Sequence, residues 1–179
     1  MIRTGQFDVE AATAAVGVIA SRVPNVTVHT VCKLLYFAEK MHLERYGRQF
    51  LKDTFVALDC GPVPSRTYDL IKSARGEGRH HQISEGDAAL FSDRVEVRGS
   101  AVSVRREPDL EDLSVSAIKC LNDTIQRYGG WDFDALTEES HDNAWHTTRE
   151  RWINGPMSLE DIARTLPDAS LLVPHLTRG

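Results

Sequence analysis

The sequence predicts an α+β fold that is mostly helical and carries a small antiparallel sheet or β-hairpin. Three long stretches repeat apolar residues at helical spacing, at residues 8–22, 27–46 and 113–128. Residues 94–98 and 101–105 instead alternate apolar and polar side chains, with only Gly99 and Ser100 between them. A chain of 179 residues can bury a core without disulfides or metals, so we expect a single domain over residues 1–179.

Residues 1–26 are predicted to form the N-terminal helix, running from about Asp8 to Arg22 and capped by Asp8 or Thr4. The second helix is predicted from Thr27 to Tyr46, where Gly47 stops it. Apolar residues cover most sides of this second helix, so we expect it to be central and packed on more than one side.

A short strand is predicted over Thr54–Leu58 because its residues are apolar and β-branched. The sequence Gly61-Pro62-Val63-Pro64 follows, and its two prolines predict a rigid bend that breaks regular structure. Ser65 is then predicted to cap a helix that runs to about Ala74.

The rest of the chain is predicted to alternate loops and short helices. Residues 76–86 are polar and predict a loop before the hairpin, and residues 132–145 predict short helical turns. Ser158 and Asp161 resemble a capping box that opens a helix to about Arg164. We expect residues 153–179 to form a C-terminal extension packed on the domain.

Charge and cysteine content exclude several classes of protein. A net charge of −5 argues against a nucleic-acid-binding protein held mainly by phosphate contacts. Between Glu107 and Asp142 the chain has ten acidic and two basic residues, which indicates either a solvated acidic face or a surface that steers a basic partner. Three widely spaced cysteines predict reduced thiols in a cytoplasmic protein. No signal peptide or apolar membrane-spanning run is present, so we expect no membrane association.

Residues with catalytic or ligand-binding chemistry are few. His80 and His81 lack the further ligands that a metal needs, and Gly61 lacks the neighbours of a phosphate loop, so no metal or cofactor is expected. Cys60 would need a histidine base such as His141 to act as a nucleophile, and nothing in the sequence brings the two together. His141 and Trp145 share a face if both lie on one helix, either as a ligand or partner site or as a core histidine under a packed tryptophan.

A series of short motifs along most of the chain, from about Val16 to Trp152, resembles the Panacea domain family, the SocA-like antitoxins of bacteria and phages. Their order and spacing carry the resemblance more than any one of them does. The motifs are Lys33–Ala38, His42–Leu43, Tyr46–Gly47, Phe55–Ala57, Gly61–Pro64, Tyr68–Ile71, Ser140–Asp142 and Trp145.

The resemblance implies a cytoplasmic antitoxin that binds and neutralises a cognate protein toxin encoded nearby. It also implies a possible role as a proteolytic adaptor that delivers the toxin to the ClpXP protease. The family provides no catalytic residues to carry over, so we expect a binding protein; a small hydrolase using Cys60 or His141 is the alternative. The residues that we expect to contact a partner are Gly61, Pro62, Val63, Pro64, Tyr68, His141 and Trp145.

Overall fold

The computed structural model describes residues 6–78 and 80–178, and it confirms a mostly helical α+β fold. Its elements, in chain order, are α1 (Val9–Arg22), α2 (Val28–Tyr46), β1 (Phe55–Leu58), β2 (Gly61–Pro64), α3 (Ser65–Ala74), α4 (Glu85–Arg94), β3 (Val95–Arg98), β4 (Ala101–Val104), the 3-10 turn η1 (Leu110–Asp112), α5 (Val115–Tyr128), α6 (Phe133–Ser140), α7 (Asn143–Arg151), α8 (Leu159–Arg164) and α9 (Ala169–Arg178).

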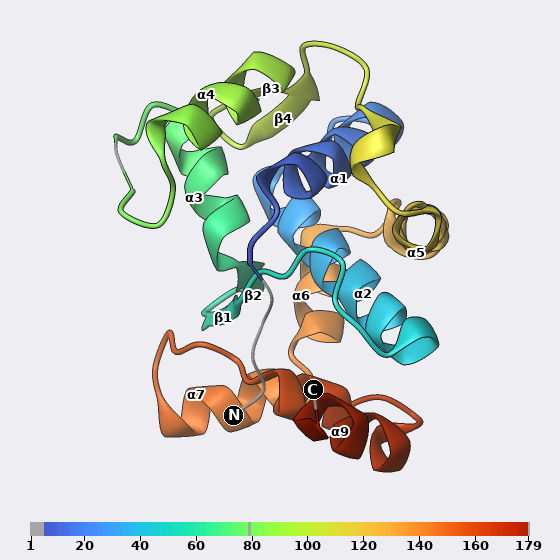
Figure 1. Cartoon of the computed structure of the whole chain (residues 1–179). Helices are drawn as coiled ribbons and strands as arrows, with labels where there is room; N and C mark the ends of the chain where they lie inside the picture. The colour runs from blue at the N-terminus through green and yellow to red at the C-terminus, as the bar shows by residue number, and fades with distance from the viewer. Residues whose placement is uncertain (1–5, 79, 179) are drawn as a thin grey trace.

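Helix α2 is the centre of the molecule, as its apolar sequence predicted. It packs against α1, α5, α6, α8 and β2, and its residues 31–39 are all buried. Figure 1 shows α3, α4 and the β3–β4 hairpin at one end of the molecule and α7 to α9 at the other, with α2 between them. The Thr27 side chain caps the start of α2, and Gly47 ends it in the left-handed conformation with φ of 65°.

The predicted ends of α1 are confirmed, with Asp8 as its N-cap: the Asp8 carboxylate accepts a hydrogen bond from the Ala11 N–H. Thr4, the other candidate cap, lies outside the described residues. The C-terminal segment contributes α8 and α9, of which α8 packs against α2 and α7.

The prediction that Gly61–Pro64 breaks regular structure is wrong, because these residues form strand β2. Strand β2 pairs with β1 in antiparallel register, with Pro62 opposite Ala57 and Pro64 opposite Phe55. The Ser65 N–H donates to the Thr54 carbonyl over 2.8 Å. Backbone N–H and C=O groups therefore point towards β1 only at alternate residues, and the backbone groups of both prolines point away from it. A proline in such a position removes no hydrogen bond from the ladder.

Two buried carboxylates hold the segment between α2 and β1. Glu39 accepts hydrogen bonds from the N–H groups of Phe50 (3.2 Å) and Leu51 (3.3 Å), and burial raises the pKa of Glu39 to about 8. Asp53 is 1% exposed and accepts hydrogen bonds from the backbone of Thr54, Arg66 and Thr67. Both acids therefore act as anchors for main-chain N–H groups that would otherwise be buried without partners.

Asp53 also explains why the predicted Ser65 cap is wrong. Ser65 is the first residue of α3, and the residue at the N-cap position, Pro64, makes no side-chain capping bond. The free N–H groups of the first turn instead donate to the Asp53 carboxylate, and the Thr67 hydroxyl adds a bond of 2.8 Å to it. Asp53, which is distant in the sequence, thus caps α3 in place of the predicted Ser65.

The β3–β4 hairpin is confirmed, with Arg98 opposite Ala101 across the predicted Gly99–Ser100 turn. Helix α4, which precedes this hairpin, was not predicted. Ser84 and Asp87 form a reciprocal capping box at its start, a pattern visible in the sequence within what was predicted to be a polar loop.

Candidate functional site

The first hairpin, β1–β2, is the point where side chains from several helices meet. Lys33 of α2 reaches it with its Nζ, which donates a hydrogen bond of 2.8 Å to the Pro62 carbonyl oxygen. Gly61 has φ of 100°, and a Cβ at this position would lie 2.4 Å from the Ser140 Oγ and 2.9 Å from the Lys33 Cε. Only glycine fits here, for both conformational and steric reasons.

Asp142, between α6 and α7, ties these helices to α2. Its carboxylate accepts hydrogen bonds from the Tyr36 hydroxyl (2.9 Å) and from the Lys40 Nζ (2.6 Å). The same carboxylate caps α7 by accepting from the Trp145 N–H over 3.1 Å. Burial, reinforced by the neighbouring Asp142 charge, raises the pKa of Tyr36 well above its ordinary value, so Tyr36 remains a hydrogen-bond donor.

His141 and Trp145 stack on one another beside the hairpin, with ring centroids 3.7 Å apart and planes 7° from parallel. They do so from two helices rather than one, because His141 is the residue that ends α6 and Trp145 lies in α7. The Trp145 Nε1 donates to the Leu58 carbonyl oxygen over 2.9 Å, which fixes the end of β1. Burial, with a contribution from the Lys33 charge, lowers the pKa of His141 and keeps the ring neutral.

A cleft of about 430 Å³ opens beside this hairpin; we name it the hairpin cleft. Val28, Cys32, Leu58, Val63 and Tyr68 give it apolar walls. The polar groups of its lining come from His29, Lys33, Asp59, Cys60, Gly61, Arg75 and Asn154.

Lys33 is the most unusual of the lining residues, because it is charged and only 1% exposed. Burial lowers the pKa of Lys33 to about 8. Burial also lowers the pKa of His29 to about 4, and the Lys33 charge contributes to that shift. The cleft therefore combines one buried ammonium group with a neutral imidazole.

Comparison with protein-family models matches residues 31–146 to the SocA-like antitoxins, Panacea domain. The chain belongs to this antitoxin family. Searches of curated proteins and of solved structures find no match. The matched segment runs from the first turns of α2 into α7, so it contains the whole first hairpin together with Lys33 and Trp145, which bind its carbonyl groups.

Within the Panacea domain, the seven residues expected to contact a partner lie close to one another but differ in accessibility. Gly61 to Pro64 are all buried, whereas Tyr68, His141 and Trp145 are partly exposed. Gly61, Val63 and Tyr68 line the hairpin cleft. Sequence analysis placed Lys33 and Ser140 in family motifs but did not name either as a partner-binding residue, although a lysine inside the apolar run of α2 was a visible signal.

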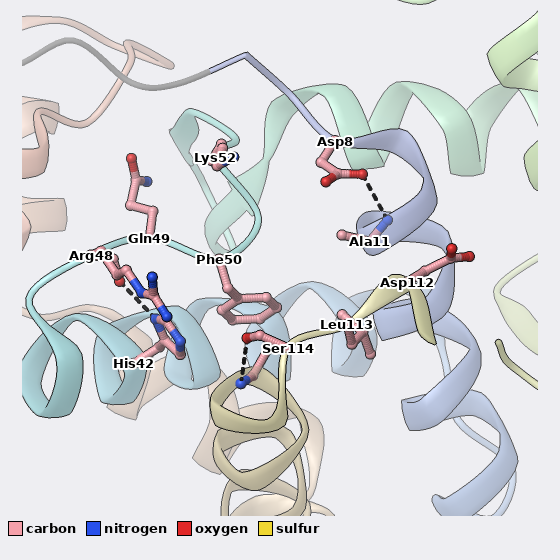
Figure 2. A pocket seen from close by; sticks show the side chains of 11 residues that line it. Asp8, Ala11, His42, Arg48, Gln49, Phe50, Lys52, Asp112, Leu113 and Ser114 are labelled. Carbon is pink, nitrogen blue, oxygen red and sulfur yellow. Dashed lines mark hydrogen bonds between the residues drawn. The ribbon is translucent and has the colours of Figure 1, made fainter. Parts of the chain in front are cut away.

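A second cleft, about 220 Å³, lies between the start of α1, the 48–52 segment and the start of α5 (Figure 2). Several of its polar side chains already bind other parts of the protein. Both ring nitrogens of His42 make hydrogen bonds, Nδ1 with the Arg48 carbonyl oxygen (2.7 Å) and Nε2 with the Ser116 hydroxyl (2.9 Å). Asp8 and Ser114 are helix caps. We therefore treat the hairpin cleft as the candidate functional site.

The described residues give no support to the hydrolase alternative. Cys60 is an exposed free thiol, and within residues 6–78 and 80–178 its sulfur makes no hydrogen bond to an imidazole. The same residues contain no group of three or more His, Cys, Asp or Glu placed to hold a metal ion. Across this part of the chain, no helix is long and apolar enough to cross a membrane.

Proposed function

We propose that this protein binds a cognate protein toxin and thereby neutralises it, and that it acts in the cytoplasm. The match of residues 31–146 to the antitoxin family supports the proposal most strongly. The geometry agrees with a binding role, because the family motifs meet in a hydrogen-bonded framework around β1–β2 that holds one surface rigid. Preorganisation of this kind lowers the entropy cost of binding. We also propose that residues 1–179 act as one domain, with the C-terminal extension joined to it through α8.

The proposed toxin surface is the hairpin cleft and its rim. Trp152 is 65% exposed and Ile153 is 72% exposed, and both directly precede Asn154, which lines the cleft. The segment that carries them runs alongside β1, where the Ala57 N–H donates to the Gly155 carbonyl over 3.0 Å. Exposed tryptophan beside a cleft is typical of the residues that dominate binding energy in protein interfaces.

The seven partner-binding residues named from the sequence have two roles in this proposal. Tyr68 contacts the toxin directly from the wall of the cleft, together with the accessible atoms of Gly61 and Val63. Pro62, Pro64, His141 and Trp145 position the hairpin from behind that surface, so changes there alter toxin binding through stability. The acidic stretch 107–142 favours a toxin with a basic surface, since opposite charge accelerates association.

The direct test is co-expression and co-purification with the product of the adjacent gene. We expect a stable complex and relief of toxicity, and we expect Trp152→Ala with Ile153→Ala to weaken the complex by about tenfold or more. Val115→Ala is the matched control, because Val115 is 84% exposed but lies at the start of α5, outside the cleft lining. If no complex forms and toxicity is not relieved, the antitoxin function is wrong. If the double variant binds normally, the toxin binds a surface other than the hairpin cleft and its rim.

The adaptor role is a further part of the proposal, resting on the family resemblance. It predicts that purified ClpXP degrades the toxin only when this protein is present, while this protein itself survives. Equal loss of toxin with and without this protein would rule out delivery to the protease and leave neutralisation by direct occlusion.

A further inference from the structure

The polar lining of the hairpin cleft has more hydrogen-bond donors than acceptors to receive them. Lys33 carries three N–H donors on Nζ, and the structure accounts for one of them, through the Pro62 carbonyl oxygen. The buried His29 Nδ1 and Arg75 Nε have no hydrogen-bond partner within the described residues. Buried nitrogens without a partner are rare in native proteins, and two of them, together with the two remaining Lys33 donors, belong to residues that line a single cleft.

The charge of Lys33 is also uncompensated, whereas Arg75, the other cation of the lining, pairs with Glu77. Lysine is almost never fully buried unless it is paired with an anion, and within residues 6–78 and 80–178 no carboxylate forms a salt bridge with Lys33. Asp59 is the only carboxylate in the cleft lining, and it is exposed and bound to Arg149 over 2.6 Å. The cleft therefore has excess positive charge where a ligand can reach it.

We propose that the hairpin cleft binds a small carboxylate ligand with a compact apolar body, with the carboxylate against the Lys33 ammonium group. The carboxylate would accept the two remaining Lys33 N–H bonds, and the apolar body would lie along Val28, Leu58, Val63 and Tyr68. A volume of about 430 Å³ is within the range of small-molecule sites.

The bond from Lys33 to Pro62 explains why a lysine supports β2, but it does not explain the position of the ammonium in the lining of an open cleft. A neutral donor would satisfy the Pro62 carbonyl without the cost of burying a charge. Binding of an anion offsets this cost, because the ion pair forms in a site from which much of the water is already excluded. The proposal does not depend on the toxin, since it concerns the isolated protein.

The test is calorimetric titration of the purified full chain with benzoate, and with benzamide as a neutral molecule of nearly the same shape. We expect benzoate to bind at least about tenfold more tightly than benzamide. Lys33→Met should remove this preference. Lys72→Met is the matched control, because Lys72 lies on α3 outside the cleft lining and pairs with Asp69.

A pH series on unsubstituted Lys33 keeps the test informative if Lys33→Met fails to fold. Because Lys33 loses its proton above about pH 8, benzoate affinity should fall about fivefold between pH 8 and 9 and about tenfold per pH unit above that. His29, His141 and Cys32 also face Lys33, but they stay neutral in this range, since the two imidazole pKa values are lowered and that of Cys32 is raised to about 11.

The Cys60 thiol, which lies near Lys33, is removed by running this series in Cys60→Ser; Arg75 is paired with Glu77 and Asp59 with Arg149. Equal affinity for benzoate and benzamide, or a pH-independent benzoate affinity, would overturn the proposal. Displacement of benzoate by millimolar chloride or phosphate would also overturn it, because the site would then hold an adventitious ion only.

Discussion

The molecule contains two hairpins of the same size that are built in opposite ways. Strands β3 and β4 alternate buried and exposed side chains, and nothing lies within 4 Å of a Cβ added at their turn glycine, Gly99. Strands β1 and β2 instead contain two prolines, a crowded Gly61 and a fully buried second strand. Side chains from α2 and α7 bind their carbonyl groups directly.

The two hairpins therefore differ in how strictly they limit the residue at each position. The β3–β4 hairpin needs only a pleat with one buried face and a flexible turn, which many sequences can supply. The β1–β2 hairpin needs particular residues at Gly61, Lys33 and Trp145, because each makes a contact that a similar residue could not make. The family match spans both hairpins, but the short motifs named from the sequence include Phe55–Ala57 and Gly61–Pro64 and none in β3 or β4.

The largest expected difference between the hairpins is in their glycines. Gly61→Ala should lower the free energy of unfolding by about 4 kcal/mol, because the new Cβ adds backbone strain at φ of 100° and overlaps the Ser140 Oγ. Gly99→Ala should cost about 1 kcal/mol, since φ of 59° is the left-handed region and the space is open. Urea denaturation measures the free energy of unfolding of both variants, and equal losses at Gly61 and Gly99 would contradict the expected difference between the hairpins.

The next effect is a pH dependence that belongs to the first hairpin. Because the Lys33 pKa is lowered from 10.5 to about 8, the unfolded chain binds more protons than the folded chain between these pH values. Stability from this group therefore rises with pH across the window, by about 3 kcal/mol in total. Lys33→Met should lose this rise in denaturation curves at pH 7.5 to 10.5.

Arg98→Met in the second hairpin is the control for this pH effect, because the Arg98 side chain is 81% exposed. Its stability curve should follow that of the unsubstituted protein at every pH. If Lys33→Met also keeps the rise between pH 8 and 10.5, the ammonium of Lys33 is not held in a buried environment.

A smaller effect is expected for the hydrogen bond from Trp145 to the end of β1. Trp145→Phe keeps an aromatic ring beside His141 but removes the donor to the Leu58 carbonyl, which should cost about 1–2 kcal/mol. Arg75→Met removes an exposed bond of 3.3 Å to the Gly99 carbonyl of the other hairpin and a surface ion pair with Glu77, and it should cost less than about 1 kcal/mol. A larger loss of stability for Arg75→Met than for Trp145→Phe in thermal denaturation would contradict this expectation.

The smallest effect concerns the prolines of β2. Pro62→Ala and Pro64→Ala should each cost about 0.4–1 kcal/mol, mainly by giving the unfolded chain more freedom. Toxin affinity, measured with the folded variants, should stay unchanged. A variant of normal stability that no longer binds the toxin would make the prolines part of the contact surface.

Local signals allowed much of the fold to be predicted. The ends of α1 and α2 were correct because Asp8, Thr27 and Gly47 are caps that act on their own helices. The β3–β4 hairpin was correct because its alternation and its turn lie within one short segment. Each of these features depends on residues a few positions apart, which a sequence displays directly.

The first hairpin and its surroundings were predicted less well, because they depend on distant partners. The cap of α3 comes from Asp53, which lies beyond an intervening hairpin, so no local pattern pointed to it. The prolines were predicted to break regular structure, because the sequence does not show whether their positions need a backbone N–H for pairing with β1. Lys33 was named as part of a motif but not as a site residue, because its burial, and the cleft beside it, arise only when α2 packs against β2.

The segment after α7 has a consequence for how any partner can bind. Residues 155–157 run beside β1 as a third strand would, with the Ala57 N–H bound to the Gly155 carbonyl and the Met157 N–H bound to the Phe55 carbonyl. The opposite edge consists of prolines without N–H groups, and the Pro62 carbonyl is occupied by Lys33. This small sheet thus has no open edge, so a partner cannot lengthen it by adding a strand and must recognise the side chains around it.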